Sequence, residues 1–293
     1  MNKGIVYGAA SYALWGFFPI YFKFLQAVPA VQIVMHRIVW SFILLLAMVV
    51  LRREVRELKA ALKGRTLLIY LAAGLLLAVN WLTYIWAINA GFIVEASLGY
   101  FINPLVSVLL GVIFLGERLR PIQWLPVVLA TAGVLYLTIS LGSLPWIALV
   151  LAFSFGLYGL VKKVAPLGSL HGLTLETGVI LLPALGYLAF AEIGGTGFFG
   201  HASLATNLLL IFSGVVTAAP LLLFAAGTRS VPLSTMGLLQ YIAPTLQFII
   251  GIMLYNEPFN QHQLLGFIMI WAALIIFSVE SLVVYRRAPA PTV

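Results

Sequence analysis

The chain has 293 residues, of which 63% are hydrophobic and only 8% are charged. A soluble globular domain carries about 25% charged residues, so this chain cannot cover itself with a hydrated surface and is expected to lie in lipid. Its net charge of +8 does not indicate a nucleic-acid partner, because the basic residues are confined to a few short connectors, as they are in membrane proteins. The absence of Cys excludes disulfides and thiolate sites, and the absence of Asp excludes intramembrane aspartyl proteases and prenyl transferases with Asp-rich metal motifs.

Apolar stretches separated by charge, Gly or Pro follow one another along the whole chain, and a helix needs about 20 such residues to cross a bilayer. The first stretch is too long for the core of a secretory signal and has no convincing cleavage site behind it, so it is expected to remain as a helix. The charge-free run 122–161 is about twice as long as one crossing, with a turn at 141–145 in its middle. The sequence therefore predicts an all-α membrane protein with ten transmembrane helices at 4–22, 31–51, 66–89, 94–115, 122–140, 145–161, 172–191, 204–227, 232–254 and 262–283.

The distribution of Lys and Arg predicts the orientation of these helices. With a cytoplasmic N-terminus, all but two of the 16 basic residues fall on the inner side, the exceptions being Lys23 and Arg37. This agrees with the excess of Lys and Arg in cytoplasmic loops. Both termini are therefore expected in the cytoplasm.

The two halves of the chain align with each other, without a gap, at a shift of 140 residues. This repeat predicts one unit at 3–140, a second at 143–283 and a short cytoplasmic tail at 284–293. Because each unit holds five spans, an odd number, the second must enter the membrane from the opposite side. Inverted repeats are typical of secondary transporters, whose substrate sites lie near the midplane between the repeats. Gene duplication of a stable bundle is the alternative. The most informative matches are Gly16 with Gly156, Gly74 with Gly214, Pro104 with Pro244, Glu117 with Glu257 and Gln123 with Gln263.

Polar and aromatic residues within the predicted spans are the candidates for a substrate site. Pro104 and Pro244 are expected to act as hinges, since each leaves the carbonyl four residues earlier without its helical donor. In lipid such a carbonyl must find a partner or line a wet cavity; kinks that only shape packing are the alternative. Asn80 and Tyr84 share one helix face, with Trp81 off that face, although hydrogen bonding between helices would also explain them. The predicted substrate-binding residues are Trp15, Asn80, Tyr84, Tyr100, Asn103, Tyr158, Gln240, Tyr241 and Gln247.

Ionisable residues at membrane depth are costly and suggest function. We expect Arg37 to pair with Glu95 near the outer mouth, and Glu176 to pair with Arg229 near the inner one, as gating or coupling pairs that form and break during transport. Snorkelling to lipid headgroups is the alternative. For Glu117 and its repeat partner Glu257 we expect backbone hydrogen bonds that fix helix–loop geometry rather than substrate contact.

Catalytic and ATP-binding patterns are absent from the sequence. The four His residues are scattered without metal-ligand spacing, and neither His-Glu-x-x-His nor a P-loop occurs. No Gly-x-Ser-x-Gly elbow is present either. An enzyme, a bound metal and a cofactor are therefore not expected. A channel would more naturally show a filter or rings formed by oligomerisation.

Three stretches carry a family resemblance: His36-Arg37 through Trp40-Ser41, the run 79–119 and the run 232–259. Together they resemble the RarD branch of the EamA family, within the drug/metabolite transporter (DMT) superfamily, over residues 3 to about 283. The resemblance implies the DMT fold of ten helices, in the bacterial inner membrane, and export of small metabolites. Amino-acid exporters of the YddG type belong to the same superfamily. We therefore expect a monomeric exporter of amino acids (Thr, Met, aromatic) that contacts its small-molecule substrate and lipid; a multidrug or other metabolite exporter is the alternative.

Overall fold

A computed structural model describes residues 3–89, 93–141, 146–255 and 261–287, and these residues form helices joined by short turns. In the first half the elements are α1 (Lys3–Gly16), α2 (Phe18–Lys23), α3 (Ala30–Leu51), α4 (Val55–Ala61), α5 (Gly64–Asn89), α6 (Ile93–Leu115), the 3₁₀ turn η1 (Pro121–Gln123) and α7 (Trp124–Leu141). In the second half they are α8 (Trp146–Val164), α9 (Ser169–Ile193), α10 (Leu204–Ser230), α11 (Leu233–Leu239), α12 (Ile242–Tyr255) and α13 (Gln261–Arg287).

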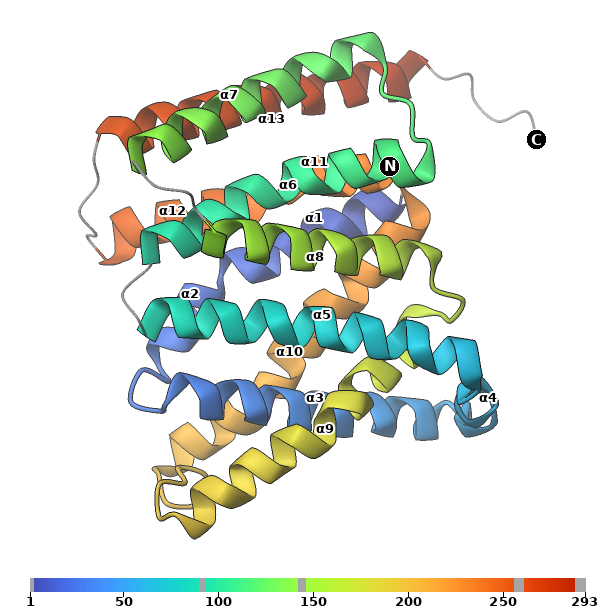
Figure 1. The fold of residues 1–293 in the computed structure, drawn as a ribbon, viewed down its shortest axis with the longest axis vertical. Coiled ribbons are helices and arrows are strands. Elements are labelled where there is room, and N and C mark those ends of the chain that lie inside the picture. Colours follow the sequence, from blue (N-terminus) through green and yellow to red (C-terminus); the bar gives the residue numbers. More distant parts are fainter. Residues whose placement is uncertain (1–2, 90–92, 142–145, 256–260, 288–293) are drawn as a thin grey trace.

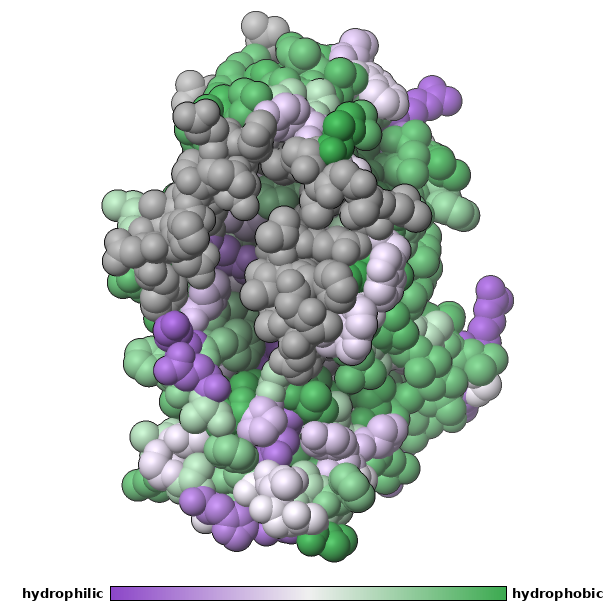
Figure 2. Space-filling model, turned by 60° about the vertical axis from the view of Figure 1, so that its left-hand side comes forward, coloured by the Kyte–Doolittle hydropathy of each residue, from purple (hydrophilic) through white to green (hydrophobic). Residues whose placement is uncertain are grey.

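The apolar character expected from the composition is confirmed by these helices. Six of the described helical segments are long and apolar enough to cross a membrane: Lys3–Lys23, Ala30–Leu51, Gly64–Tyr84, Trp146–Val164, Ser169–Ile193 and Leu204–Ser230. Large apolar side chains stand exposed on them, as Leu182, Phe190 and Ile193 do on α9. The space-filling view shows apolar side chains over most of the described surface of one face (Figure 2). A surface of this kind requires lipid rather than water, and the chain is an integral membrane protein.

Two predicted spans are broken where proline removes a backbone donor. The predicted helix 4–22 divides into α1 and α2 just before Pro19, which lies in the first turn of α2. The predicted helix 232–254 divides into α11 and α12 just before Pro244. Pro104, by contrast, lies inside the continuous helix α6. The short helix α4, within the basic connector, was not predicted, and α8 extends to Val164.

The helices form a layered bundle in which segments far apart in the sequence lie side by side. Figure 1 shows α7 and α13 at one end of the molecule and α3 and α9 at the other, with α10 running obliquely from that end into the middle of the bundle. The largest contacts join a helix of the first half to one of the second: α6 with α8 and α11, α1 with α10 and α12, α5 with α8 and α9, α3 with α9 and α10, and α7 with α13. The start of α1, the helix α4 and the end of α13 lie on the same side of the bundle (Figure 1).

Glycines permit close approaches between the halves. A Cβ atom added at Gly214 would lie 2.5 Å from the carbonyl carbon of Trp40, and one at Gly16 would lie 2.6 Å from the Cβ of Leu246. The repeat partner of Gly16 is in the same situation, since a Cβ at Gly156 would lie 2.7 Å from a side-chain methyl of Val106. Small residues at helix interfaces allow close packing in membranes, so these positions hold the two halves together.

We predict that Gly214→Ala lowers the thermal stability of the purified protein, whereas Gly186→Ala does not. Both substitutions replace a helical Gly and gain about 1 kcal/mol of helix propensity. The added methyl at Gly214 meets backbone atoms of Trp40, while the one at Gly186 meets nothing within 4 Å. Overpacking typically costs about 1–3 kcal/mol, so the two melting temperatures in detergent should move in opposite directions. Equal shifts would contradict the assignment of Gly214 to a tight interface.

Candidate functional site

A cavity of about 250 Å³ lies between the two halves of the bundle. Helices α1, α2, α3, α5 and α6 of the first half and α8, α10 and α12 of the second contribute to its wall. Seven of the nine predicted substrate-binding residues line it, together with Arg37 and Pro244; these seven are Trp15, Asn80, Tyr84, Tyr100, Asn103, Gln240 and Gln247. The remaining two, Tyr158 and Tyr241, are fully buried in the surrounding bundle.

An aromatic wall covers a large part of this cavity, and much of it was missed in the sequence. Trp15 packs edge-on against Phe155, with ring centroids 5.6 Å apart, and Tyr84 packs edge-on against Tyr100 at the same distance. Trp81, which was not predicted to face inward with Asn80, also lines the cavity. The sequence of the first predicted span did contain a signal for part of this wall. Residues three or four apart share one helix face, and this spacing joins the cavity residues Tyr12, Trp15, Pro19 and Phe22.

Several cavity residues have structural partners that fix their positions. The amide of Asn80 donates to the carbonyl of Leu151 (2.9 Å) and to the hydroxyl of Ser154 (3.0 Å), which ties α5 to α8. The amide of Gln247 donates to the carbonyl of Trp15 (3.1 Å). Since Pro19 has no N–H for that carbonyl, Gln247 supplies the missing donor across the two halves.

Two amide oxygens on the cavity wall have no partner of this kind. The Oδ1 atom of Asn103 and the Oε1 atom of Gln240 are buried and accept no hydrogen bond from the described residues. Unsatisfied buried acceptors are rare and costly in proteins. Both side chains line the cavity, but the oxygens themselves are closed off from solvent, so a bound ligand would reach them only after a small movement of the wall.

The backbone at the second hinge is satisfied locally. The carbonyl of Gln240, freed by Pro244, accepts from the backbone N–H of Ala243 (3.1 Å) instead of turning into the cavity. The hydroxyl of Tyr241, in the break between α11 and α12, donates to the carbonyl of Phe101 on α6 (3.2 Å). Tyr241 therefore acts as a bridge between the broken helix and its unbroken counterpart.

Arg37 enters the cavity from α3 and is only 9% exposed. Its Nε atom donates to the hydroxyl of Thr217 on α10 (2.8 Å). Its guanidinium carbon lies 4.9 Å from the ring centroid of Trp81, 5.3 Å from that of Phe22 and 5.6 Å from that of Phe18. Among the described side chains it has no carboxylate partner. The predicted partner, Glu95, belongs to α6, but its side chain lies outside the described residues.

Glu176 pairs with a residue other than the predicted one. Its carboxylate accepts from the ammonium of Lys162 (2.7 Å) and from the hydroxyl of Tyr158 (3.0 Å), and both charged side chains are buried, at 0% and 3% exposure. Arg229 instead donates to the carbonyls of Ala165 and Leu167, at 2.6 Å each. The predicted pair of Glu176 with Arg229 is therefore not formed. Lys162 was missed because its span was expected to end at Val161, whereas α8 continues past it.

The interpretation of Glu117 as a structural residue agrees with its contacts. Its carboxylate accepts from the backbone N–H groups of Leu233 (2.6 Å) and Ser234 (2.9 Å), and from the hydroxyl of Ser234 (2.6 Å). It thus caps the first turn of α11, where free N–H groups favour a negative charge. The repeat partner Glu257 lies outside the described residues.

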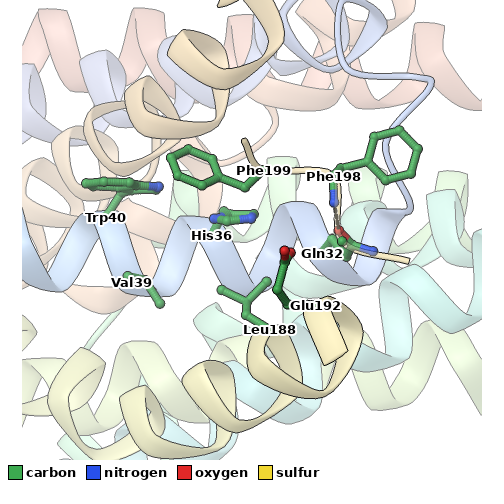
Figure 3. A pocket seen from close by; sticks show the side chains of 9 residues that line it. Gln32, His36, Val39, Trp40, Leu188, Glu192, Phe198 and Phe199 are labelled. Carbon is green, nitrogen blue, oxygen red and sulfur yellow. Dashed lines mark hydrogen bonds between the residues drawn. The ribbon is translucent and has the colours of Figure 1, made fainter. Parts of the chain in front are cut away.

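A second cavity, of about 340 Å³, lies between α3, α9 and the connector 194–203 (Figure 3). None of the predicted site residues line it. Gln32 holds the connector in place by accepting from the N–H of Phe198 (3.1 Å) and donating to the carbonyl of Thr196 (2.7 Å). The carboxylate of Glu192 is already bonded to His201 (2.7 Å). This cavity involves one corner of the bundle, whereas the first lies where both halves meet, and we take the first as the candidate site.

Known proteins resemble this chain over nearly its whole length. The profile of the EamA-like transporter family matches it twice, at residues 2–139 and 144–279. The chain is 48% identical to "Uncharacterized transporter YojE" of Bacillus subtilis, covering 98% of this chain and 97% of that one. It is 43% identical to "Protein RarD" of Escherichia coli and 30% identical to "Chloramphenicol-sensitive protein RarD" of Pseudomonas aeruginosa, again over 98% of this chain and 97% of each relative.

A solved crystal structure shares the fold, with a TM-score of 0.68 over 93% of this chain and 96% of that one, at 17% sequence identity. The membership in a transporter family points to a protein that is not an enzyme. The twofold family match and the full-length relatives together establish that the chain belongs to the EamA-like transporter family, in the branch of its RarD relatives, and is a membrane transporter.

Proposed function

We propose that this transporter exports small metabolites, amino acids among them, across the bacterial inner membrane by alternating access between two inverted repeats. The observation that carries the proposal is the cavity between the halves, with its aromatic wall and its free amide oxygens. Transporters with inverted repeats hold their substrate at such an interface. The protein acts as a monomer in this proposal, because one chain supplies every wall of the site.

The packing of the helices supports the repeat. Replacing each helix by its counterpart 140 residues away exchanges one large contact for another: α1 with α10 becomes α8 with α5, and α3 with α10 becomes α9 with α5. In the same way α6 with α8 becomes α12 with α1. A structure built of exchangeable contacts has a second packing of similar energy, in which the halves swap roles. That second packing would expose the cavity to the other side.

The hydrogen bonds between the halves follow the same exchange. The side chain of Asn80 donates to the carbonyl of Leu151 (2.9 Å), and the side chain of Ser11 donates to the carbonyl of Pro220 (2.8 Å). Ser11 and Leu151 are repeat partners, as are Asn80 and Pro220. Together with the twofold family match, this supports ten spans in units 3–140 and 143–283. The basic connector helix α4 lies on the same side of the bundle as the start of α1 and the end of α13 (Figure 1). This supports a cytoplasmic location for both termini.

The shape and chemistry of the cavity favour a small amphipathic substrate. Its volume of about 250 Å³ lies just below the roughly 300–1,000 Å³ typical of ligand pockets, which suits a small metabolite better than a bulky drug. The free oxygens of Asn103 and Gln240 would accept from an ammonium group. The aromatic wall would contact an apolar side chain. That wall also favours the second candidate, a multidrug exporter, and a relative named "Chloramphenicol-sensitive protein RarD" makes this alternative worth testing.

The buried pair of Lys162 with Glu176 is proposed as the closure of the inner side. It joins α8 to α9, next to a packed aromatic group in which Tyr158 stacks on Phe224 with ring centroids 5.9 Å apart. Opening toward the cytoplasm would separate these elements, with Pro104 and Pro244 as hinges. In this proposal Arg229 fixes the connector between α8 and α9, and Glu95 is expected near the outer mouth.

The transport proposal predicts saturable uptake of amino acids by liposomes that contain the purified protein. Labelled Thr, Met and Phe would be tested against protein-free liposomes, with chloramphenicol as the probe of the alternative. Because the cavity wall is aromatic, we expect Phe to be transported at least as well as Thr. Folded protein that moves none of the three amino acids would exclude this substrate class, and movement of chloramphenicol alone would favour the multidrug alternative.

The inverted repeat predicts that equivalent connectors of the two halves lie on opposite sides of the membrane. Lys63→Cys and His201→Cys provide the test, since both positions are exposed and the chain contains no natural Cys. A membrane-impermeant maleimide should label His201→Cys in intact spheroplasts and Lys63→Cys only after permeabilisation. The unsubstituted chain is the control for background. Labelling of both from one side would refute the inversion.

The proposed inner closure predicts that stability and transport respond differently to two variants. Glu176→Gln leaves Lys162 buried without its partner, which typically costs about 3–5 kcal/mol. The double variant Glu176→Gln with Lys162→Met removes the whole pair and should recover most of the melting temperature. We nevertheless expect its transport rate in liposomes to differ several-fold from that of the native chain. A double variant that is both stable and fully active would show that the pair is structural only.

A further inference from the structure

We propose that Arg37 is the anchor for a carboxylate group of the substrate, which makes the substrate class organic acids and zwitterions rather than organic cations or neutral drugs. That the bound ligand is a transported substrate rests on the proposed function. The anion site itself rests on geometry alone. Nothing in the family match or in the names of the relatives assigns it.

The first observation is a buried cation whose hydrogen-bonding capacity is mostly unused. A guanidinium carries five N–H donors and stays protonated in proteins. Only the Nε donor of Arg37 has a partner among the described residues, the hydroxyl of Thr217. A charge at membrane depth is costly without a counter-charge or water. Among the described residues, the two terminal nitrogens of Arg37 therefore have no hydrogen-bond acceptor.

The second observation is the way in which this guanidinium is held. Three rings from two helices surround it: Trp81 on α5, and Phe18 and Phe22 on α2, at 4.9–5.6 Å. Aromatic faces stabilise a cation but offer no hydrogen-bond acceptor to it. Thr217 fixes its direction from the other half of the bundle. A planar fork held in this way matches the two oxygens of a carboxylate.

The third observation is the distribution of polar atoms around the same cavity. Arg37 supplies donors, while Asn103 and Gln240 carry acceptors that have no partner among the described residues. Arg37 belongs to the first half, as does Asn103, and Gln240 belongs to the second. A zwitterion with an acidic and an ammonium end would satisfy both sets at once. A neutral apolar drug would leave all of them unpaired, at a cost for each buried polar group.

The test compares two ligands that differ only in the acidic group. Purified native protein is titrated with 3-phenylpropanoate and with 3-phenylpropanamide, and binding is measured by the rise in melting temperature, which reports affinity for the folded state. We expect the acid to bind at least roughly ten-fold more tightly than the amide, as is typical when a hydrogen bond to a charged group is lost. Equal binding of the two ligands, or no binding of the acid, would overturn the proposal. Equal binding is the result expected if Glu95 already neutralises Arg37.

Variants assign the effect to Arg37. Arg37→Gln should remove the preference for the acid, and Arg37→Lys should retain part of it, because the charge remains while the fork is lost. Arg65→Gln, an exposed position at the start of α5, removes one positive charge away from the cavity and should keep the preference. An unchanged preference in Arg37→Gln would refute the assignment. Should Arg37→Gln not fold, the comparison of acid with amide on native protein and on Arg37→Lys still decides.

This experiment separates the inference from the transport proposal. Acid-selective binding in a protein that transports no amino acid would uphold the Arg37 site and refute the proposed function. Transport of amino acids together with equal transport of their amides would uphold the proposed function and refute the Arg37 site. Either result identifies which of the two ideas has failed.

Discussion

Hydrocarbon offers no hydrogen bonds, so every polar group inside this bundle must find its partner within the protein or at a wet cavity. Several side chains do so across the two halves. Ser11 and Asn80 donate to carbonyls of the opposite half, and Gln247 replaces the donor that Pro19 lacks. Among the described residues, two of the five side chains that keep a buried polar atom without a hydrogen bond, Asn103 and Gln240, line the cavity that Arg37 enters, whereas Trp40 lines the second cavity. Unpaired polar atoms therefore gather at the candidate site without being confined to it.

The same constraint explains why the prolines at equivalent positions behave differently. Pro104 is accommodated inside a continuous helix, while the chain before Pro244 breaks and its freed carbonyl bonds locally to Ala243. Tyr241 then bridges the broken helix to the unbroken one. A kink costs little where a neighbouring element resupplies the lost hydrogen bond. Two copies of one unit can therefore keep the same proline and still adopt different backbones, which an exchange of roles requires.

The sequence was sufficient for the membrane class and for the polar part of the cavity wall, because periodicity and polarity are local properties. Asn80, Tyr84 and Asn103 could be selected as polar residues in apolar helices, and they do line the cavity. Partners could not be selected in this way. The choice of Lys162 rather than Arg229 for Glu176 depends on how α8, α9 and α10 pack in three dimensions. Aromatic residues such as Trp81 and Phe155 were missed because rings that face lipid and rings that face a cavity look alike in sequence.

The chemical differences between the copies bear on how a symmetric design could move substrate in one direction. The repeat partners of Lys162, Glu176 and Tyr158 are Phe22, His36 and Phe18, so the ion pair exists on one side only. On the other side the equivalent rings pack against Arg37 instead. An equilibrium between two states shifts only as far as their contacts differ in free energy. In the proposed cycle the inner closure is held by the buried pair of Lys162 with Glu176, and the outer closure by contacts around Arg37. A ligand that neutralises Arg37 would therefore change the relative free energies of the two closed states. Binding and conformational change would then be coupled through a single guanidinium, without any external ion being required by the architecture.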